Sequence, residues 1–157
     1  MKKLFLDFMQ LSILLKIILV LSLILFLISL TQPAFFIDRK EDPNAYSNSF
    51  VLFLLGWMSF LGGAFIPFVI WLANPLFFLS IYFTIRKKSV GCITALVSTC
   101  LAIIFSQLTT VMTSESGSSS MITGFGLGFK LWLSSFVVLT IGLLTHFFLF
   151  KKNNSTC

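Results

Sequence analysis

The sequence predicts an all-α fold: an integral membrane bundle of four transmembrane helices, with a broken second helix and both termini in the cytoplasm. Of its 157 residues, 57% are hydrophobic and 10% are charged, and the mean hydropathy is +1.03. A soluble domain needs more polar surface than this composition supplies. Apolar runs of roughly twenty or more residues recur, a length that matches about 30 Å of bilayer hydrocarbon. We therefore treat residues 1–157 as a single membrane domain in contact with the lipid bilayer.

The first predicted span covers residues 11–31. It follows Lys2 and Lys3, as the apolar core of a secretory signal does. The length of the run, the charge at Lys16 and the lack of an A-x-A-like site in the following TQPAFF favour a retained anchor. We expect Lys16 to lie near the cytoplasmic end with its ammonium reaching the interface, and a buried functional lysine is the alternative.

The segment after this span, residues 36–49, is the most polar part of the chain and predicts an extramembrane loop. Its tripeptide DPN at 42–44 is a turn signal, because proline fixes φ and asparagine tolerates left-handed backbone. The carboxylates of Asp38, Glu41 and Asp42 either belong to a solvated charged loop or capture a cation or a partner.

The second apolar run is too long for one straight crossing. It extends over residues 50–85, about 54 Å of helix, whereas the bilayer with its headgroups is about 45 Å thick. Glycine and proline offer places to break it, at Gly62-Gly63, at Pro67 and at Asn74-Pro75.

We predict that this run crosses once, over residues 50–72, and then breaks within the sequence WLANP. Residues 76–85 would form a short helix near the cytoplasmic interface or a half-helix packed back into the bundle. Backbone groups freed by a break cannot face lipid, so they need partners in the protein or in a wet cavity. The candidate structural or functional break is therefore Trp71, Asn74 and Pro75.

The third and fourth predicted spans cover residues 90–112 and 125–150, separated by a polar loop that contains TSESGSSS. Small residues recur every three or four positions in the second and third spans, which is typical of closely packed membrane helices. The sequence GFGLGFK, with glycines at 124, 126 and 128, predicts a pliable start to the fourth span. The candidate helix-packing residues are Gly56, Gly63, Gly91, Ala95 and Ala102.

The placement of basic residues sets the expected orientation. With four crossings and a cytoplasmic N-terminus, the inside carries far more lysine and arginine than the outside, as the positive-inside rule expects in a bacterial inner membrane. Because these residues flank apolar runs, we do not expect nucleic-acid binding. The basic residues inside are Lys2, Lys3, Lys16, Arg86, Lys87, Lys88, Lys151 and Lys152, and those outside are Arg39, Lys40 and Lys130.

The spans lack the groups that catalysis inside a membrane needs. They contain no aspartate or glutamate, and His146 is the only histidine of the chain. The cysteines Cys92, Cys100 and Cys157 are too scattered for a metal site or a disulfide framework. We expect no enzymatic activity, no cofactor and no metal.

The pattern GW…GG…WLANP, over residues 56–76, resembles one in small multi-span proteins of bacterial membranes whose role is not known. The resemblance implies a multi-pass inner-membrane protein and no particular activity. We expect an accessory or interaction subunit that binds another membrane protein or self-associates. The alternatives are an immunity protein against a pore-forming toxin and a component of a small transporter.

Overall fold

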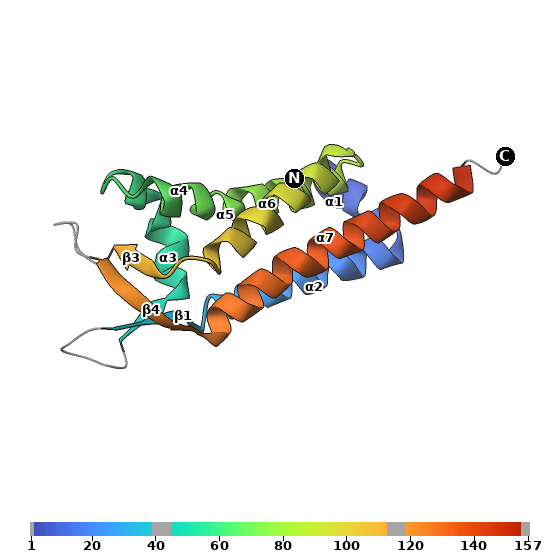
Figure 1. Cartoon of the computed structure of the whole chain (residues 1–157). Coiled ribbons are helices and arrows are strands. Elements are labelled where there is room, and N and C mark those ends of the chain that lie inside the picture. The colour runs from blue at the N-terminus through green and yellow to red at the C-terminus, as the bar shows by residue number, and fades with distance from the viewer. Residues whose placement is uncertain (1, 39–44, 113–118, 155–157) are drawn as a thin grey trace.

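The computed structural model describes residues 2–38, 45–112 and 119–154, and in these ranges it contains helices and one small sheet (Figure 1). The elements are, in chain order, α1 (Lys2–Met9), α2 (Ile13–Ser29), β1 (Pro33–Ile37), β2 (Tyr46–Asn48), α3 (Ser49–Leu55), the 3-10 helix η1 (Gly56–Phe60), α4 (Phe65–Trp71), α5 (Ala73–Ile85), α6 (Val90–Phe105), β3 (Thr110–Met112), β4 (Ser119–Phe125) and α7 (Leu127–Asn154). The predicted turn at 42–44 and the carboxylates of Glu41 and Asp42 lie outside the described residues.

The four strands contradict the predicted all-α bundle. Helices account for 71% and strands for 13% of the described residues. The strands form one antiparallel sheet in the order β2-β1-β4-β3, at the end where the chain leaves α2 and α6 and enters α7 (Figure 1). Its segments are rich in aromatic and β-branched residues, which suit a pleated surface. β1 and β4 lie in or beside segments that were predicted to be separate loops. By pairing, each strand supplies hydrogen-bond partners for the backbone N–H and C=O groups of the other.

The number of spans also differs from the prediction. Among the described residues, two helices, Phe65–Ile85 and Leu127–Phe148, are long and apolar enough to cross a membrane. A third span is added if α1 and α2, between which the chain bends by 118°, count as one span. α6 has 16 residues, about 24 Å of helix, and so falls short of about 30 Å of hydrocarbon. It is short because the end of the predicted span 90–112 forms β3.

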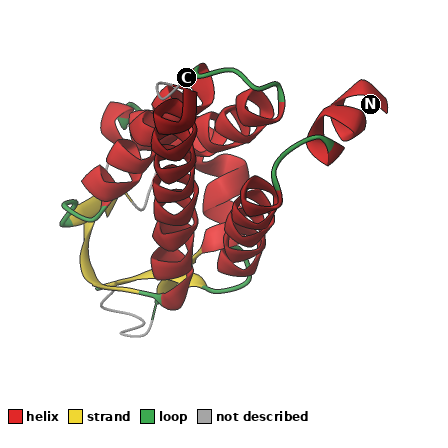
Figure 2. Ribbon diagram, turned by 90° about the vertical axis from the view of Figure 1, so that its right-hand side faces the viewer, coloured by secondary structure: helices red, strands yellow, loops and turns green. Residues whose placement is uncertain are grey.

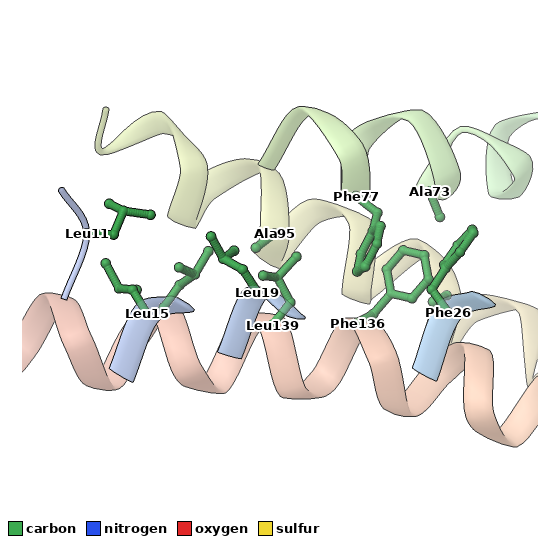
Figure 3. Packing of buried hydrophobic residues seen from close by; sticks show 11 residues of the cluster. Leu11, Leu15, Leu19, Phe26, Ala73, Phe77, Ala95, Phe136 and Leu139 are labelled. Carbon is green, nitrogen blue, oxygen red and sulfur yellow. The ribbon is translucent and has the colours of Figure 1, made fainter. Parts of the chain in front are cut away.

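The helices pack side by side along most of their length, with α7 beside α2 and α6 between α5 and α7 (Figures 1 and 2). The buried positions of α2 recur every three or four residues, as one face of a helix requires. Figure 3 shows the centre of this core, where the ring of Phe26 stacks on Phe77 at a centroid distance of 5.1 Å and Phe136 lies 4.8 Å from Phe77.

The second apolar run reverses direction at a glycine pair and not at Asn74-Pro75. α3 begins at Ser49 and is capped by Asn48, whose side-chain oxygen accepts from the Phe50 amide at 2.9 Å. α3 and η1 run across the end of the other helices, beside the sheet (Figure 1). The chain then turns at 61–64, where Gly63 has a φ of 77°, a conformation that favours glycine.

After this turn α4 and α5 form one long helix, Phe65–Ile85, with a local irregularity at Leu72. The predicted crossing at 50–72, followed by a separate short helix at 76–85, is therefore wrong. The residues of the run that a single crossing does not need form α3 and η1, which come before the long helix and not after it.

Candidate functional site

A cavity of about 400 Å³ lies between the sheet and the helices. Every part of the second apolar run up to Asn74 contributes to its wall, together with residues from the strands and from α6 and α7. Its volume falls within the range of about 300–1,000 Å³ that is usual for small-molecule sites. The lining residues are Ser29, Leu30, Ala34, Phe35, Ile37, Tyr46, Ser47, Ser49, Leu52, Phe53, Gly56, Ser59, Ala64, Pro67, Ile70, Trp71, Asn74, Phe105, Val111, Gly128, Phe129 and Trp132.

Asn74 explains why the helix continues past a proline. The missing N–H of Pro75 leaves the carbonyl of Trp71 without its helical donor. The side-chain amide of Asn74 replaces this donor, since Nδ2 donates to the Trp71 carbonyl at 3.1 Å. Asn74 is only 6% exposed, and its Oδ1 accepts a hydrogen bond from the Trp132 indole of α7 at 2.9 Å. The helix therefore continues through the WLANP sequence because Asn74 replaces the missing hydrogen bond. Asn74 also links α5 to α7 through its bond to Trp132.

Trp71 fixes the position of the α3–η1 segment. Its indole Nε1 donates to the carbonyl of Phe53 at 2.9 Å. A Cβ placed on Gly56 would collide with the indole carbon Cδ1 of Trp71. Trp71 and Asn74 both line the cavity, whereas Pro75 does not. Two of the three predicted break residues, Trp71 and Asn74, therefore meet at one site, although they do not end the helix.

The aromatic side of the cavity comes from α6, α7 and β1. The ring of Phe105 lies 5.6 Å from Phe35 and 5.4 Å from Phe129, and Trp132 lies 5.9 Å from Phe129. Such edge and tilted contacts hold aromatic rings in fixed orientations. The wall facing α3 is therefore rigid and apolar.

Three serine hydroxyls of the lining donate to backbone carbonyls. Ser29 donates to the Phe26 carbonyl at 2.6 Å, Ser49 to Gln32 at 2.6 Å and Ser59 to Gly56 at 2.6 Å. Among the described residues that line the cavity, none carries a charge. This arrangement suits the binding of an apolar group, because each of these serine hydrogens already has an acceptor.

The predicted packing residues divide into two groups. On α6, Gly91 lies against Thr84, where a Cβ would approach the side-chain oxygen to 2.6 Å, and Ala95 and Ala102 are fully buried. Gly63 differs, because a Cβ there would meet no atom within 4 Å. The positive φ of Gly63 makes it a turn residue, so the prediction of helix packing at this position is wrong.

Sequence reasoning missed two groups of residues that join the elements. Gly126 and Gly128 admit the backbone of residues 32–34, and the Gly126 amide donates to the Ala34 carbonyl at 2.8 Å. The start of α7 is thus a close contact and not a pliable segment. In the core, the hydroxyls of Thr99 and Thr140 lie 2.8 Å apart. A signal for the first group was available in the alternate spacing of the glycines.

The end opposite the sheet carries the ionic contacts. Arg86 donates to the Asp7 carboxylate at 3.0 Å, which ties α1 to the end of α5. The side chain of Tyr82, and after it Asp7, raises the pKa of Arg86 above its ordinary value, so the guanidinium stays charged. Lys16 donates to the Met9 carbonyl at 2.7 Å and is half-exposed, and its place at a membrane interface stays a prediction. Within the described ranges no three metal-ligating side chains come together.

Comparison with protein-family models, with curated proteins and with solved structures finds no match for this chain. The resemblance of the GW…GG…WLANP pattern to small bacterial membrane proteins therefore stays a prediction.

Proposed function

We propose that this chain is a non-enzymatic integral membrane protein that acts by binding another membrane protein through the outer face of its sheet. The proposal starts from association with a bilayer, because two or three helices in the described part of the chain are long and apolar enough to span a membrane. The observation that carries the proposal is an aromatic pair on the sheet. Phe36 of β1 lies opposite Tyr46 of β2, and these residues are 39% and 56% exposed.

The geometry of the sheet supports a binding role for this pair. Phe35 and Ile37, on either side of Phe36, are buried beneath the sheet, so Phe36 belongs to the opposite face. Pairing of β1 with β4 joins the two extramembrane segments into one preformed surface. Aromatic residues are enriched at protein interfaces, where a rigid surface loses little conformational entropy on binding.

The double substitution Phe36→Ser with Tyr46→Ser is expected to abolish a stoichiometric complex while leaving the protein folded, since both side chains are exposed. The full-length tagged chain would be cross-linked in native membranes, purified and measured by quantitative mass spectrometry. Phe148→Ser is the matched control, because Phe148 is 64% exposed on α7, away from the sheet. Equal partner recovery with the double variant and the control would rule out binding through this face.

For the orientation, we propose that the sheet lies outside the cytoplasm and that both termini lie inside. Support comes from the distribution of charge in the structure. Arg86, Lys87 and Lys88 connect α5 to α6 at the end remote from the sheet, where α1 also lies (Figure 1). Positively charged residues are favoured on the cytoplasmic side of a membrane.

Single-cysteine labelling of the intact protein tests this orientation. In a background in which Cys92, Cys100 and Cys157 are replaced by serine, Ser119→Cys should react with a membrane-impermeant maleimide on intact cells. Lys88→Cys should react only after the membrane is permeabilised. The reverse pattern would place the basic end outside and contradict the proposal.

A further inference from the structure

We propose that the cavity beneath the sheet binds a single hydrocarbon chain of a membrane amphiphile, with the polar end of that molecule beside β2. This inference does not require the protein partner: Tyr46 belongs to both the cavity wall and the outer aromatic pair, so the tests below change only residues outside that pair. It starts from the chemistry of the described lining residues, which are mostly aromatic and aliphatic and carry no charge. Among the polar groups of the lining, the hydroxyls of Ser29, Ser49 and Ser59 and the amide of Asn74 are hydrogen-bonded within the protein.

Water is a poor occupant of this cavity. A buried water needs about three polar partners, whereas the hydrogens of Ser29, Ser49 and Ser59 are already donated to backbone carbonyls. Both functional atoms of the Asn74 side chain are also engaged. An apolar occupant instead supplies dispersion contacts to a wall that otherwise lacks partner atoms.

The size of the cavity suits a hydrocarbon chain. The cavity measures about 400 Å³, a volume within the range of about 300–1,000 Å³ that is usual for small-molecule sites. A slender hydrocarbon chain fits between the aromatic wall of Phe105, Phe129 and Trp132 and the small residues Gly56 and Ser59.

The opening of the cavity is amphipathic. The most exposed lining side chains are Tyr46 of β2 and Leu52 of α3, which are 56% and 36% exposed, so the opening lies between these elements. On the α3 side the apolar residue Leu52 lines it, and on the β2 side Ser47 lines the cavity next to Tyr46. A molecule with an apolar tail and a polar end matches both sides.

Native mass spectrometry of the full-length protein, released from nanodiscs of bacterial lipid extract, tests the proposal. We expect one chain-bearing adduct per protein, whose mass distinguishes a diacyl phospholipid from a free fatty acid. The cavity-filling variants Ser59→Phe and Ala64→Phe should reduce its occupancy at least tenfold. Ser134→Phe is the matched control, since Ser134 is exposed on α7 and does not line the cavity.

A second measurement locates the chain and does not depend on the survival of any adduct in the gas phase. A single-chain fatty acid with a nitroxide on its chain would be titrated into nanodiscs, in a Trp57→Phe background that leaves Trp71 and Trp132 as reporters. Saturable quenching at one probe per protein, lost in Ser59→Phe, is expected. Linear quenching without saturation, or an adduct that persists unchanged in both filled variants, would overturn the proposal.

Discussion

Replacing Asn74 with alanine is expected to lower the free energy of unfolding by about 2–3 kcal/mol. The substitution removes the acceptor of the Trp132 indole and the donor that compensates for Pro75, so two polar groups lose their partners together. Unfolding in mixed micelles of a mild detergent and dodecyl sulfate, followed by circular dichroism, measures the change. Among the substitutions of single polar side chains in this protein, it has the largest expected effect.

The contribution of the interhelical bond can be separated by a double-mutant cycle. Trp132→Phe keeps an aromatic ring on α7 and removes the hydrogen bond to Asn74, whose loss is expected to cost about 1 kcal/mol, within the range for hydrogen bonds between membrane helices. The two substitutions should be non-additive, because the second finds the bond already lost. Strict additivity would show that Asn74 and Trp132 do not interact and that the pairing described here is wrong.

Gly128→Ala is expected to destabilise the protein by at least about 2–3 kcal/mol. A Cβ at this position would lie 2.6 Å from the carbonyl oxygen of Gln32 and 2.7 Å from that of Pro33. These atoms belong to the backbone that leads into β1, so relief requires α7 and the sheet to move apart. Gly126→Ala should act in the same way, since its Cβ would meet the Pro33 carbonyl. Thermal unfolding in detergent, monitored by size-exclusion chromatography, reports the loss.

The matched control for this prediction is Gly124→Ala, in the same glycine sequence. A Cβ on Gly124 meets no atom within 4 Å, so the free energy of unfolding should stay within about 0.5 kcal/mol of the original value. Similar effects at 124 and 128 would mean that the glycines serve chain flexibility and not close packing.

Part of this architecture follows from the sequence because hydrophobicity and residue size act locally. The apolar runs locate the helices, and small residues at a spacing of three or four mark the face of α6 that contains Ala95 and Ala102. The WLANP sequence marked Trp71 and Asn74, which the structure places at the cavity. In these cases the property that decides the structure is carried by neighbouring residues.

The sheet and the position of the reversal depend on contacts between distant segments, which a single sequence does not display. The short segment PAFFI lies between two strands because it meets β4 from the far part of the chain, whereas TVM pairs with the same strand from nearby in the sequence. At Pro75 the prediction of a break failed because the amide of the preceding residue replaces the lost donor. The role of Trp132 could not be predicted from the sequence, because its hydrogen-bond partner Asn74 is distant in the chain.

The pairing of β1 with β4 also has a consequence for how the protein is made. β1 belongs to the early part of the chain and β4 to the late part, with Phe36 aligned opposite Gly124. While the ribosome is still synthesising the middle helices, one edge of β1 has no strand to pair with, and exposed strand edges recruit other chains. Biogenesis therefore contains a defined interval, closed by the emergence of β4, in which a membrane chaperone would protect this edge from wrong partners.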